Sequence, residues 1–221
     1  MSGGGLRHSM LWIIPGILIS YLLGSIPTAY LFGRILKGID IRNFGSGNVG
    51  ATNALRVLGK GPGITVLILD TLKGYVAVVF LGNIIAPNLA SISDTAVRIL
   101  LGLSVVLGHN WTVFLKFKGG KGMATTLGVL AGLALKVTGL KLIFALVILT
   151  WLAVFMITRI VSLASILAGI SLPILVALFK ESAILRFTSI ILALFILLRH
   201  KSNLKRLFQG KEPRLNFKKS L

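Results

Sequence analysis

Hydrophobic residues form seven long runs in this 221-residue chain, and short polar or glycine-rich segments separate them. A helix needs about 20 mainly apolar residues to cross a bilayer core of about 30 Å. The expected spans are residues 11–32, 62–86, 96–115, 123–135, 142–158, 160–179 and 183–198, of which the fourth is the shortest. We therefore expect an all-α, polytopic integral membrane protein with about seven transmembrane helices.

No internal repeat or long linker divides the chain, so residues 1–221 are expected to form a single membrane domain. Within it, residues 1–10 would be an N-terminal tail. Residues 11–198 would form the transmembrane bundle with its loops, and residues 199–221 a basic cytoplasmic tail.

Lysine and arginine residues are unevenly divided between the two ends of the expected spans. When the 34–61 loop, the 116–121 loop, Arg159 and the segment after residue 198 share one side, that side receives 17 of the 24 Lys and Arg residues. Cytoplasmic loops carry such an excess of positive charge. The sequence therefore predicts an outside N-terminus, a cytoplasmic C-terminus and two glycine-rich stretches on the cytoplasmic side.

Composition excludes several kinds of chemistry. The chain is 55% hydrophobic and has no cysteine, which rules out disulfides, thiolate nucleophiles and cysteine-bound metals. Its five carboxylates are too few for a carboxylate–metal site or for clustered-aspartate phosphotransfer, and we expect no metal and no cofactor. The acyltransferase signature of a histidine with an aspartate five residues later is also absent, because Phe114 stands at that offset from His109.

The net charge of +19 indicates anionic partners. Membrane lipids and phosphorylated substrates fit this charge, whereas the chain lacks a folded module for recognising nucleic acid, so no nucleic acid is expected. A basic tail next to a membrane span is typical of a lipid-headgroup anchor.

A first polar, glycine-rich stretch comprises residues 45–53. Gly45, Gly47 and Gly50 allow turns that expose backbone N–H groups to an anion, and a helix beginning near Ala51 would add its positive end. Hydrogen-bonding side chains and one arginine accompany these glycines: Ser46, Asn48, Thr52, Asn53 and Arg56. The stretch matches the dinucleotide pattern G-x-G-x-x-G, but no buried strand precedes it, so a nucleotide fold is disfavoured. The alternative is an ordinary loop with glycine turns.

A second stretch, residues 117–122, combines adjacent glycines with cations. Gly119 and Gly120 would let a phosphate approach the backbone, and Lys121 would supply a point charge. Gly122 stands where a P-loop has Ser or Thr, so this is not a P-loop. A tight turn between helices with interfacial lysines is an equally good interpretation.

Ionisable residues inside the expected spans are candidates for function. His109 is one, although a histidine hydrogen-bonded between helices is the alternative. Asp70 and Lys73 lie three residues apart and are expected to form a structural ion pair on one helical face. Ser162 and Ser165 share a face of the sixth expected span, where hydroxyl groups often join helices.

Several separated motifs, in this order, resemble those of the bacterial acyl-phosphate:glycerol-3-phosphate acyltransferases, the PlsY family. The resemblance runs from about Leu22 to Gly210. Its motifs are Gly24-Ser25-Ile26-Pro27, Ser46-Gly47-Asn48-Val49-Gly50-Ala51-Thr52-Asn53, Gly108-His109 with Phe117-Lys118-Gly119-Gly120-Lys121-Gly122, Arg159-Ile160-Val161-Ser162-Leu163-Ala164-Ser165, and Arg199-His200 with Asn203. It implies a seven-span, multi-pass enzyme of the bacterial inner membrane whose active site faces the cytoplasm.

The resemblance also implies the reaction and its residues. A fatty acyl group would pass from acyl phosphate to the 1-position of glycerol 3-phosphate, giving lysophosphatidic acid and phosphate, with the substrate's own phosphate taking the hydroxyl proton. The implied catalytic residues are Ser46, Arg56, Lys121, His109, Ser165 and Asn203. The implied phosphate-binding residues are Gly47, Asn48, Thr52, Asn53, Gly119, Gly120, Ser162 and His200. A monomer is the expected assembly.

Two other functions fit the same pattern of residues. Broken spans, intramembrane charges and glycine-rich loops also occur in transporters and channels for phosphorylated metabolites or anionic lipids. A noncatalytic lipid-binding subunit would bind anionic lipid without releasing phosphate from acyl phosphate.

Overall fold

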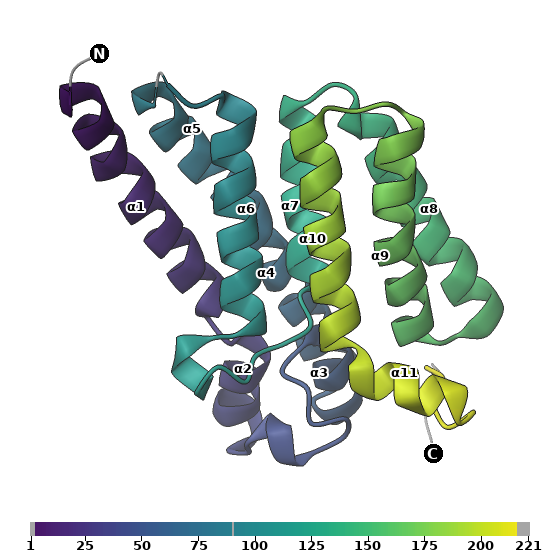
Figure 1. Ribbon diagram of the computed structural model, residues 1–221. Coiled ribbons are helices and arrows are strands. Elements are labelled where there is room, and N and C mark those ends of the chain that lie inside the picture. Colours follow the sequence, from purple (N-terminus) through teal and green to yellow (C-terminus); the bar gives the residue numbers. More distant parts are fainter. Residues whose placement is uncertain (1–2, 90, 216–221) are drawn as a thin grey trace. The chain divides into compact units, whose positions relative to one another are not determined.

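The computed structural model describes residues 3–89 and 91–215, and all regular secondary structure within these residues is helical (Figure 1). Internal contacts divide the chain into two compact units, Met1–Thr138 (unit 1) and Gly139–Leu221 (unit 2). The single membrane domain expected from the sequence stays a prediction.

Unit 1 contains helices that differ widely in length. They are α1 (Gly3–Ser25), α2 (Thr28–Lys37), α3 (Ala51–Val57), α4 (Lys60–Val76), α5 (Gly82–Ile85), α6 (Asp94–Asn110) and α7 (Met123–Lys136). A π-helical segment (Ala77–Leu81) joins α4 to α5, so one almost continuous helical stretch runs from Lys60 to Asn88. The helix expected to start near Ala51 is α3.

The first expected span, residues 11–32, is not one helix. α1 ends at Ser25 and α2 begins at Thr28, and Pro27 lies at the break. Proline has no N–H to donate and disfavours helical geometry in the residue before it, here Ile26. At its other end, α1 begins at Gly3, so the expected N-terminal tail is helical from that residue onward.

Glycines allow two close helix crossings in unit 1. Where α1 meets α6, a methyl group on Gly24 would overlap the backbone of Val105, and one on Gly108 would overlap the backbone of Tyr21. α4 and α7 cross in the same way, with Gly128 against the backbone of Thr71. Small residues are common at helix crossings within membranes because they let the two backbones approach closely.

Arg98 on α6 supports the π-helical segment. Its guanidinium donates to the carbonyl oxygen of Val78 at 2.7 Å and to Asn83 Oδ1 at 2.9 Å, and it pairs with Asp94 at 2.7 Å. A π-helix shifts the regular i→i−4 hydrogen bonds and leaves carbonyl groups to be satisfied. Gly82 gives the arginine room, because a methyl group there would overlap it.

Unit 2 contains the helices α8 (Leu140–Thr158), α9 (Val161–Leu178), α10 (Ala183–Arg199) and α11 (Lys201–Phe208). α9 packs against both α8 and α10. α11 turns away from α10 by 63° at His200. After Gly210, whose φ is +65°, the chain folds back, and the Leu215 N–H donates to the Arg159 carbonyl at 2.8 Å. The part of the basic tail beyond residue 215 lies outside the described residues.

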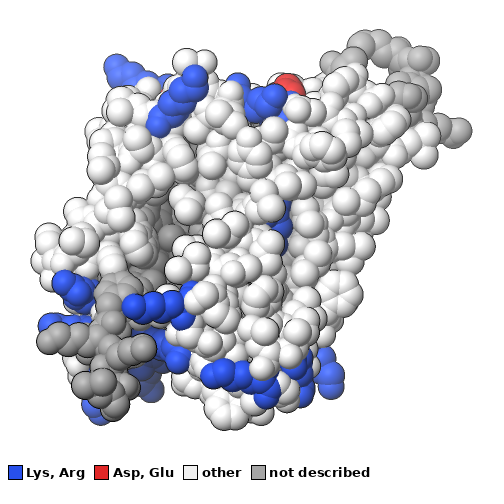
Figure 2. Space-filling view, turned by 180° about the vertical axis from the view of Figure 1, so that it is seen from behind, with Lys and Arg blue, Asp and Glu red and all other residues white. Residues whose placement is uncertain are grey.

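Within residues 3–89 and 91–215, five helical stretches are long and apolar enough to cross a membrane, or six if the bent pair α10–α11 counts as one. α7 has 14 residues and is about 21 Å long, which is less than the bilayer core. The count of seven spans therefore stays a prediction. Figure 2 shows Lys and Arg mainly near the upper and lower edges of the face drawn, with few between them.

Candidate functional site

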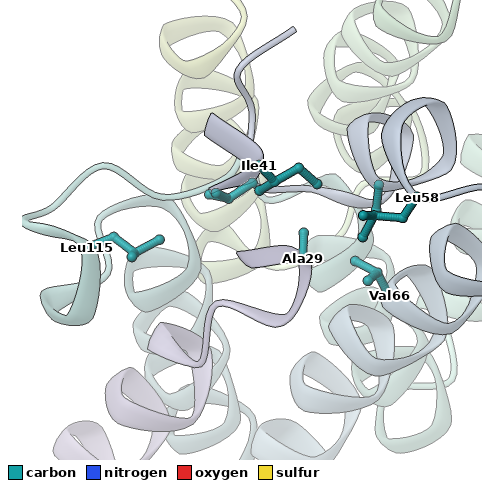
Figure 3. Close-up of a cluster of buried hydrophobic side chains, with 7 residues drawn as sticks. Ala29, Ile41, Leu58, Val66 and Leu115 are labelled. Atoms are coloured by element: carbon teal, nitrogen blue, oxygen red, sulfur yellow. The ribbon is translucent and has the colours of Figure 1, made fainter. Parts of the chain in front are cut away.

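The first glycine-rich stretch and the segment that leads into the second share a hydrophobic cluster at one end of unit 1. Figure 1 shows α2, α3 and the segment after α6 at this end. Figure 3 shows the cluster in close-up; it contains Val49 from the first stretch and Leu115 from the segment that leads into the second. Its members are Ala29, Ile41, Val49, Ala54, Leu58, Val66 and Leu115. The shared core explains how segments far apart in the sequence come together.

Asn53 fixes the shape of the first stretch. Its Oδ1 accepts the Ser46 N–H at 2.8 Å, and its Nδ2 donates to the carbonyls of Ile41 and Phe44 at 3.3 and 3.1 Å. The side chain is 1% exposed, so these bonds satisfy an amide that would otherwise be buried at high cost. In this state Asn53 orients Ser46 through the backbone.

The remaining groups of the first stretch differ in exposure. Ser46 and Arg56 are exposed, whereas Asn48 and Thr52 are half-buried. Thr52 and Arg56 are four residues apart in α3 and therefore share a helical face. The Gly47 amide differs from expectation, because its N–H donates to the Phe44 carbonyl at 3.1 Å and is not presented to an anion.

The second stretch packs on the end of α6. The N–H of Gly119 donates to the Asn110 carbonyl at 3.2 Å, and that of Gly120 donates to the His109 carbonyl at 2.9 Å. Methyl groups on these glycines would overlap the His109 carbonyl and the His109 ring respectively. Close packing therefore requires glycine at both positions, whatever their role toward phosphate. Lys121 follows directly and is half-buried.

Buried polar side chains surround the start of α7. The Asn110 amide is fully buried beside Gly122, which precedes α7. Within the described part of the chain, this amide and the hydroxyls of Thr125 and Thr126 have no hydrogen-bond partner. Such groups are uncommon in proteins, and they make this end of unit 1 a polar environment beneath the second stretch.

The expected Asp70–Lys73 ion pair is confirmed, with Lys73 Nζ 2.8 Å from Asp70 Oδ1. No carboxylate partner of His109 was expected from the sequence, yet His109 Nδ1 lies 3.7 Å from the same oxygen. All three side chains are buried. The sequence did show that a carboxylate inside an apolar run is rare. That observation alone does not predict which histidine will lie near the carboxylate in the folded protein.

A charged cluster lies before the first stretch. Arg42 forms a bidentate pair with Asp40, with its closest contact at 2.6 Å, and Arg34 and Arg42 each place a guanidinium 5.3 Å from the centre of the Tyr30 ring. The hydrogen bonds from Arg42 lower the pKa of Asp40 to about 2. This carboxylate is therefore an ion-pair partner and not a base at neutral pH.

In unit 2, Ser162 and Asn203 come together around Glu212, a carboxylate that was not among the predicted site residues. Both donate to Glu212 Oε1, at 2.7 and 2.6 Å, and Arg206 donates to Glu212 Oε2 at 2.7 Å. Burial raises the pKa of Glu212, but the three hydrogen bonds and the charge of Arg206 outweigh burial, so its pKa is lowered. Glu212 lies beyond the last family motif, and its neighbours gave no signal of this role.

The other two predicted residues of unit 2 are also buried and engaged. The Trp151 indole donates to Ser165 Oγ at 3.3 Å, and His200 Nδ1 lies 2.8 Å from the Ile196 carbonyl, to which it donates. Within the described residues of the whole chain, no three His, Asp or Glu side chains are placed to share a metal ion.

Comparisons with known proteins give a consistent match. The family model described as "Glycerol-3-phosphate acyltransferase" matches residues 14–210. A glycerol-3-phosphate acyltransferase of Desulforudis audaxviator is 44% identical over 211 residues, which is 96% of this chain and 100% of the relative. One from a Synechococcus strain is 44% identical over 202 residues, covering 91% of this chain and 94% of the relative.

The chain belongs to the glycerol-3-phosphate acyltransferase family. Its fold is similar to the crystal structure of PlsY (YgiH), an integral membrane glycerol 3-phosphate acyltransferase, in its glycerol 3-phosphate form. The TM-score is 0.80 and the identity is 39%, covering 92% of this chain and 96% of that one. A second form of that protein, with lysophosphatidic acid, gives a TM-score of 0.77 at 38% identity, covering 92% and 95%.

Family membership makes this chain an integral, multi-pass membrane enzyme and confirms the resemblance seen in the motifs. The matched family is an enzyme family, and not one of transporters, channels or noncatalytic lipid-binding subunits. The roles predicted for individual site residues stay predictions.

Proposed function

We propose that this membrane acyltransferase moves a fatty acyl group from acyl phosphate to the 1-position of glycerol 3-phosphate, giving lysophosphatidic acid and inorganic phosphate. The observation that carries the proposal is the hydrophobic cluster shared by the first glycine-rich stretch and the segment leading into the second. The exposed Arg56 adjoins Val57, which packs on this cluster, and the half-buried Lys121 follows Leu115 by six residues. Two cations beside glycine turns can each pair with one phosphorylated group.

The proposed reaction needs no protein carboxylate as base. The glycerol 1-hydroxyl attacks the acyl carbon, an ester C–O bond forms, and the bond between the acyl carbon and the phosphate oxygen breaks. A substrate phosphate oxygen takes the hydroxyl proton, and the leaving phosphate carries the displaced electron pair. Arg56 and Lys121 stabilise the negative charge that develops on phosphate, and Ser46, Asn48 and Thr52 orient the reactants.

His109 and the glycines of both stretches support the backbone that forms this site. Glycine at 119 and 120 allows the backbone to lie on His109, and Asn53 keeps Ser46 in place. The roles that the family resemblance gives to Ser162, Ser165, His200 and Asn203 stay predictions.

The proposed topology has seven spans, an outside N-terminus and a site facing the cytoplasm of the bacterial inner membrane. Its support is the gathering of 17 of the 24 cations on one predicted side. The two cationic stretches belong to that side, where glycerol 3-phosphate is available from water and acyl phosphate from the lipid. Membrane lipids are the other expected partners, and a monomer remains the expected assembly.

The decisive experiment is an assay of purified protein in lipid nanodiscs with palmitoyl phosphate and glycerol 3-phosphate, measuring released phosphate and lysophosphatidic acid together. We expect equal amounts of both products. Arg56→Ala and Lys121→Ala should lower kcat/KM by roughly a hundredfold or more, as removal of a charge-stabilising donor typically does. Both variants should insert and purify normally.

Two results would contradict the proposal. Transfer from an acyl thioester but not from palmitoyl phosphate would overturn the donor. Near-wild-type turnover in a folded Arg56→Ala or Lys121→Ala protein would remove that residue from the site.

A further inference from the structure

The buried ion pair of α4, Asp70–Lys73, also contacts residues outside its own helix. Asp70 is 1% exposed and Lys73 is 6% exposed, and their charged atoms are 2.8 Å apart. Two buried charges in a membrane helix are costly to desolvate and are retained where additional polar partners use them. The pair has such partners in two places, at the break between α1 and α2 and at the end of α6.

One side is the break between α1 and α2. Lys73 Nζ donates to the Ile26 carbonyl at 3.2 Å, and the Thr28 hydroxyl donates to Asp70 Oδ1. A buried carbonyl outside a regular helix needs a donor from elsewhere in the protein. The pair therefore holds the broken first span against α4.

The other side is the end of α6. His109 Nδ1 lies 3.7 Å from Asp70 Oδ1, beyond direct hydrogen-bond distance, so the imidazole and the carboxylate are close neighbours in a buried site. The His109 ring lies against Gly120, and its carbonyl accepts the Gly120 N–H at 2.9 Å. Lys121 is the next residue. A short chain of contacts thus leads from Asp70 to the cation of the second stretch.

The break is tied to the same end of α6 by separate bonds. The Thr112 hydroxyl donates to the Ser25 carbonyl at 2.6 Å, and the Tyr21 hydroxyl donates to the Trp111 carbonyl at 2.8 Å. Asp70 therefore lies between the α1–α2 break and the end of α6, which are also joined directly by these two bonds. A change in the charge of Asp70 is expected to shift both segments.

We infer that Asp70 is a positioning residue for the acyltransferase reaction. Its carboxylate, neutralised by Lys73, fixes the His109 ring and the end of the first span, and so sets where the second stretch presents Lys121 to the phosphate of glycerol 3-phosphate. This inference rests on the proposed function. A merely structural ion pair would stabilise the helices without setting the affinity for that phosphate.

The test compares Asp70→Asn, the double variant Asp70→Asn/Lys73→Met, and wild type in the nanodisc assay. Asp70→Asn keeps the shape of the side chain but leaves Lys73 unpaired. The double variant removes both charges and so avoids an uncompensated buried cation. We expect both to raise the KM for glycerol 3-phosphate about tenfold, because a small misplacement of a substrate-binding group is costly, with a smaller change in kcat and none in the KM for palmitoyl phosphate.

Asp94→Asn is the matched control. It removes the carboxylate of a different ion pair, Asp94–Arg98 on α6, and Asp94 lies about 22 Å along that helix from His109. We expect it to leave the KM for glycerol 3-phosphate unchanged even if it lowers the melting temperature.

The double variant decides the matter if Asp70→Asn alone does not fold. A KM for glycerol 3-phosphate equal to that of wild type in the folded double variant would overturn the inference, because a structural pair alone predicts recovery once both charges are gone. The wild-type protein separates this result from failure of the proposed function. If wild type forms no lysophosphatidic acid, the assigned reaction is wrong, whereas an active wild type with unaffected variants rejects only the role of Asp70.

Discussion

Gly120 and Gly61 show how differently two glycines of unit 1 depend on having no side chain. A methyl group on Gly120 would overlap the His109 ring, whereas one on Gly61 in α4 would meet nothing within 4 Å. The first glycine is required by packing, and the second only adds backbone freedom to a helix. The same substitution at the two positions therefore separates the two effects.

We expect Gly120→Ala to lower the free energy of unfolding by about 1–3 kcal/mol, because a buried neighbour must move to admit the methyl group. It should also raise the KM for glycerol 3-phosphate, since Lys121 moves with the loop. Gly61→Ala should instead change the free energy of unfolding by less than about 1 kcal/mol and leave the kinetics unchanged, since crowding by Pro62 offsets the gain in helix propensity. Thermal melting in detergent and steady-state assays measure both. A Gly120→Ala protein with wild-type KM and stability would contradict the packing described.

Two elements of the fold depend on single ionisable side chains. The π-helical segment rests on Arg98, and the returning C-terminal segment rests on Glu212. In each case one charged group satisfies several polar groups from separate helices or loops. Removing it leaves those groups buried without partners, which costs more than losing one hydrogen bond.

Arg98→Met should lower the free energy of unfolding by about 2–4 kcal/mol, because the Val78 carbonyl and Asn83 lose their buried donor. Arg98→Lys should recover only part of this loss, since an ammonium cannot reach the carbonyl, Asn83 and Asp94 in one planar geometry. Chemical unfolding in mixed micelles measures both values. Equal stability of the methionine and lysine variants would show that charge geometry at the π-helix is unimportant.

Glu212→Gln should release the segment that ends at Leu215. We expect faster hydrogen exchange of the Leu215 amide, which donates to the Arg159 carbonyl in the folded protein. Because the folded pKa of Glu212 lies below its ordinary 4.5, the carboxylate stabilises the fold fully above pH 4.5, and this contribution is lost as the pH falls through the folded pKa. The difference in the exchange rate of the Leu215 amide between Glu212→Gln and wild type should therefore become smaller as the pH falls below 4.5.

Glu181→Gln is the matched control, since it changes the other carboxylate of unit 2. It should leave the exchange of Leu215 as it is in wild type at every pH. A Glu212→Gln protein whose Leu215 amide stays protected would mean that backbone contacts alone hold the segment.

At the scale of the whole molecule, the features that could be predicted from the sequence are those that depend on composition and on residue spacing. Long apolar runs gave the helices, and the i,i+3 spacing gave the Asp70–Lys73 pair. It did not predict that the first run would break at Pro27, because a proline inside a membrane helix is often tolerated. Nor did it link His109 to Asp70 or Ser162 to Glu212, since such partners are set by how distant segments pack.

The number of crossings depends on α7, whose 14 residues do not match the bilayer thickness. If α7 crosses, Ser182 lies outside and Ser202 lies in the cytoplasm. If α7 re-enters the same side, every later connection changes sides, so the two positions exchange. Both serines are exposed, which makes them suitable positions for labelling.

The chain has no cysteine, so Ser182→Cys and Ser202→Cys can each carry the single thiol without any background. We expect a membrane-impermeant maleimide to label Ser182→Cys in intact spheroplasts and Ser202→Cys only after permeabilisation, in variants that keep wild-type activity. Lys136 at the end of α7 supports this outcome, because its long side chain can reach the interface from a short helix. The reverse labelling pattern would remove α7 from the spans and place residues 199–215 outside, where their excess of cations would oppose the usual rule for membrane proteins.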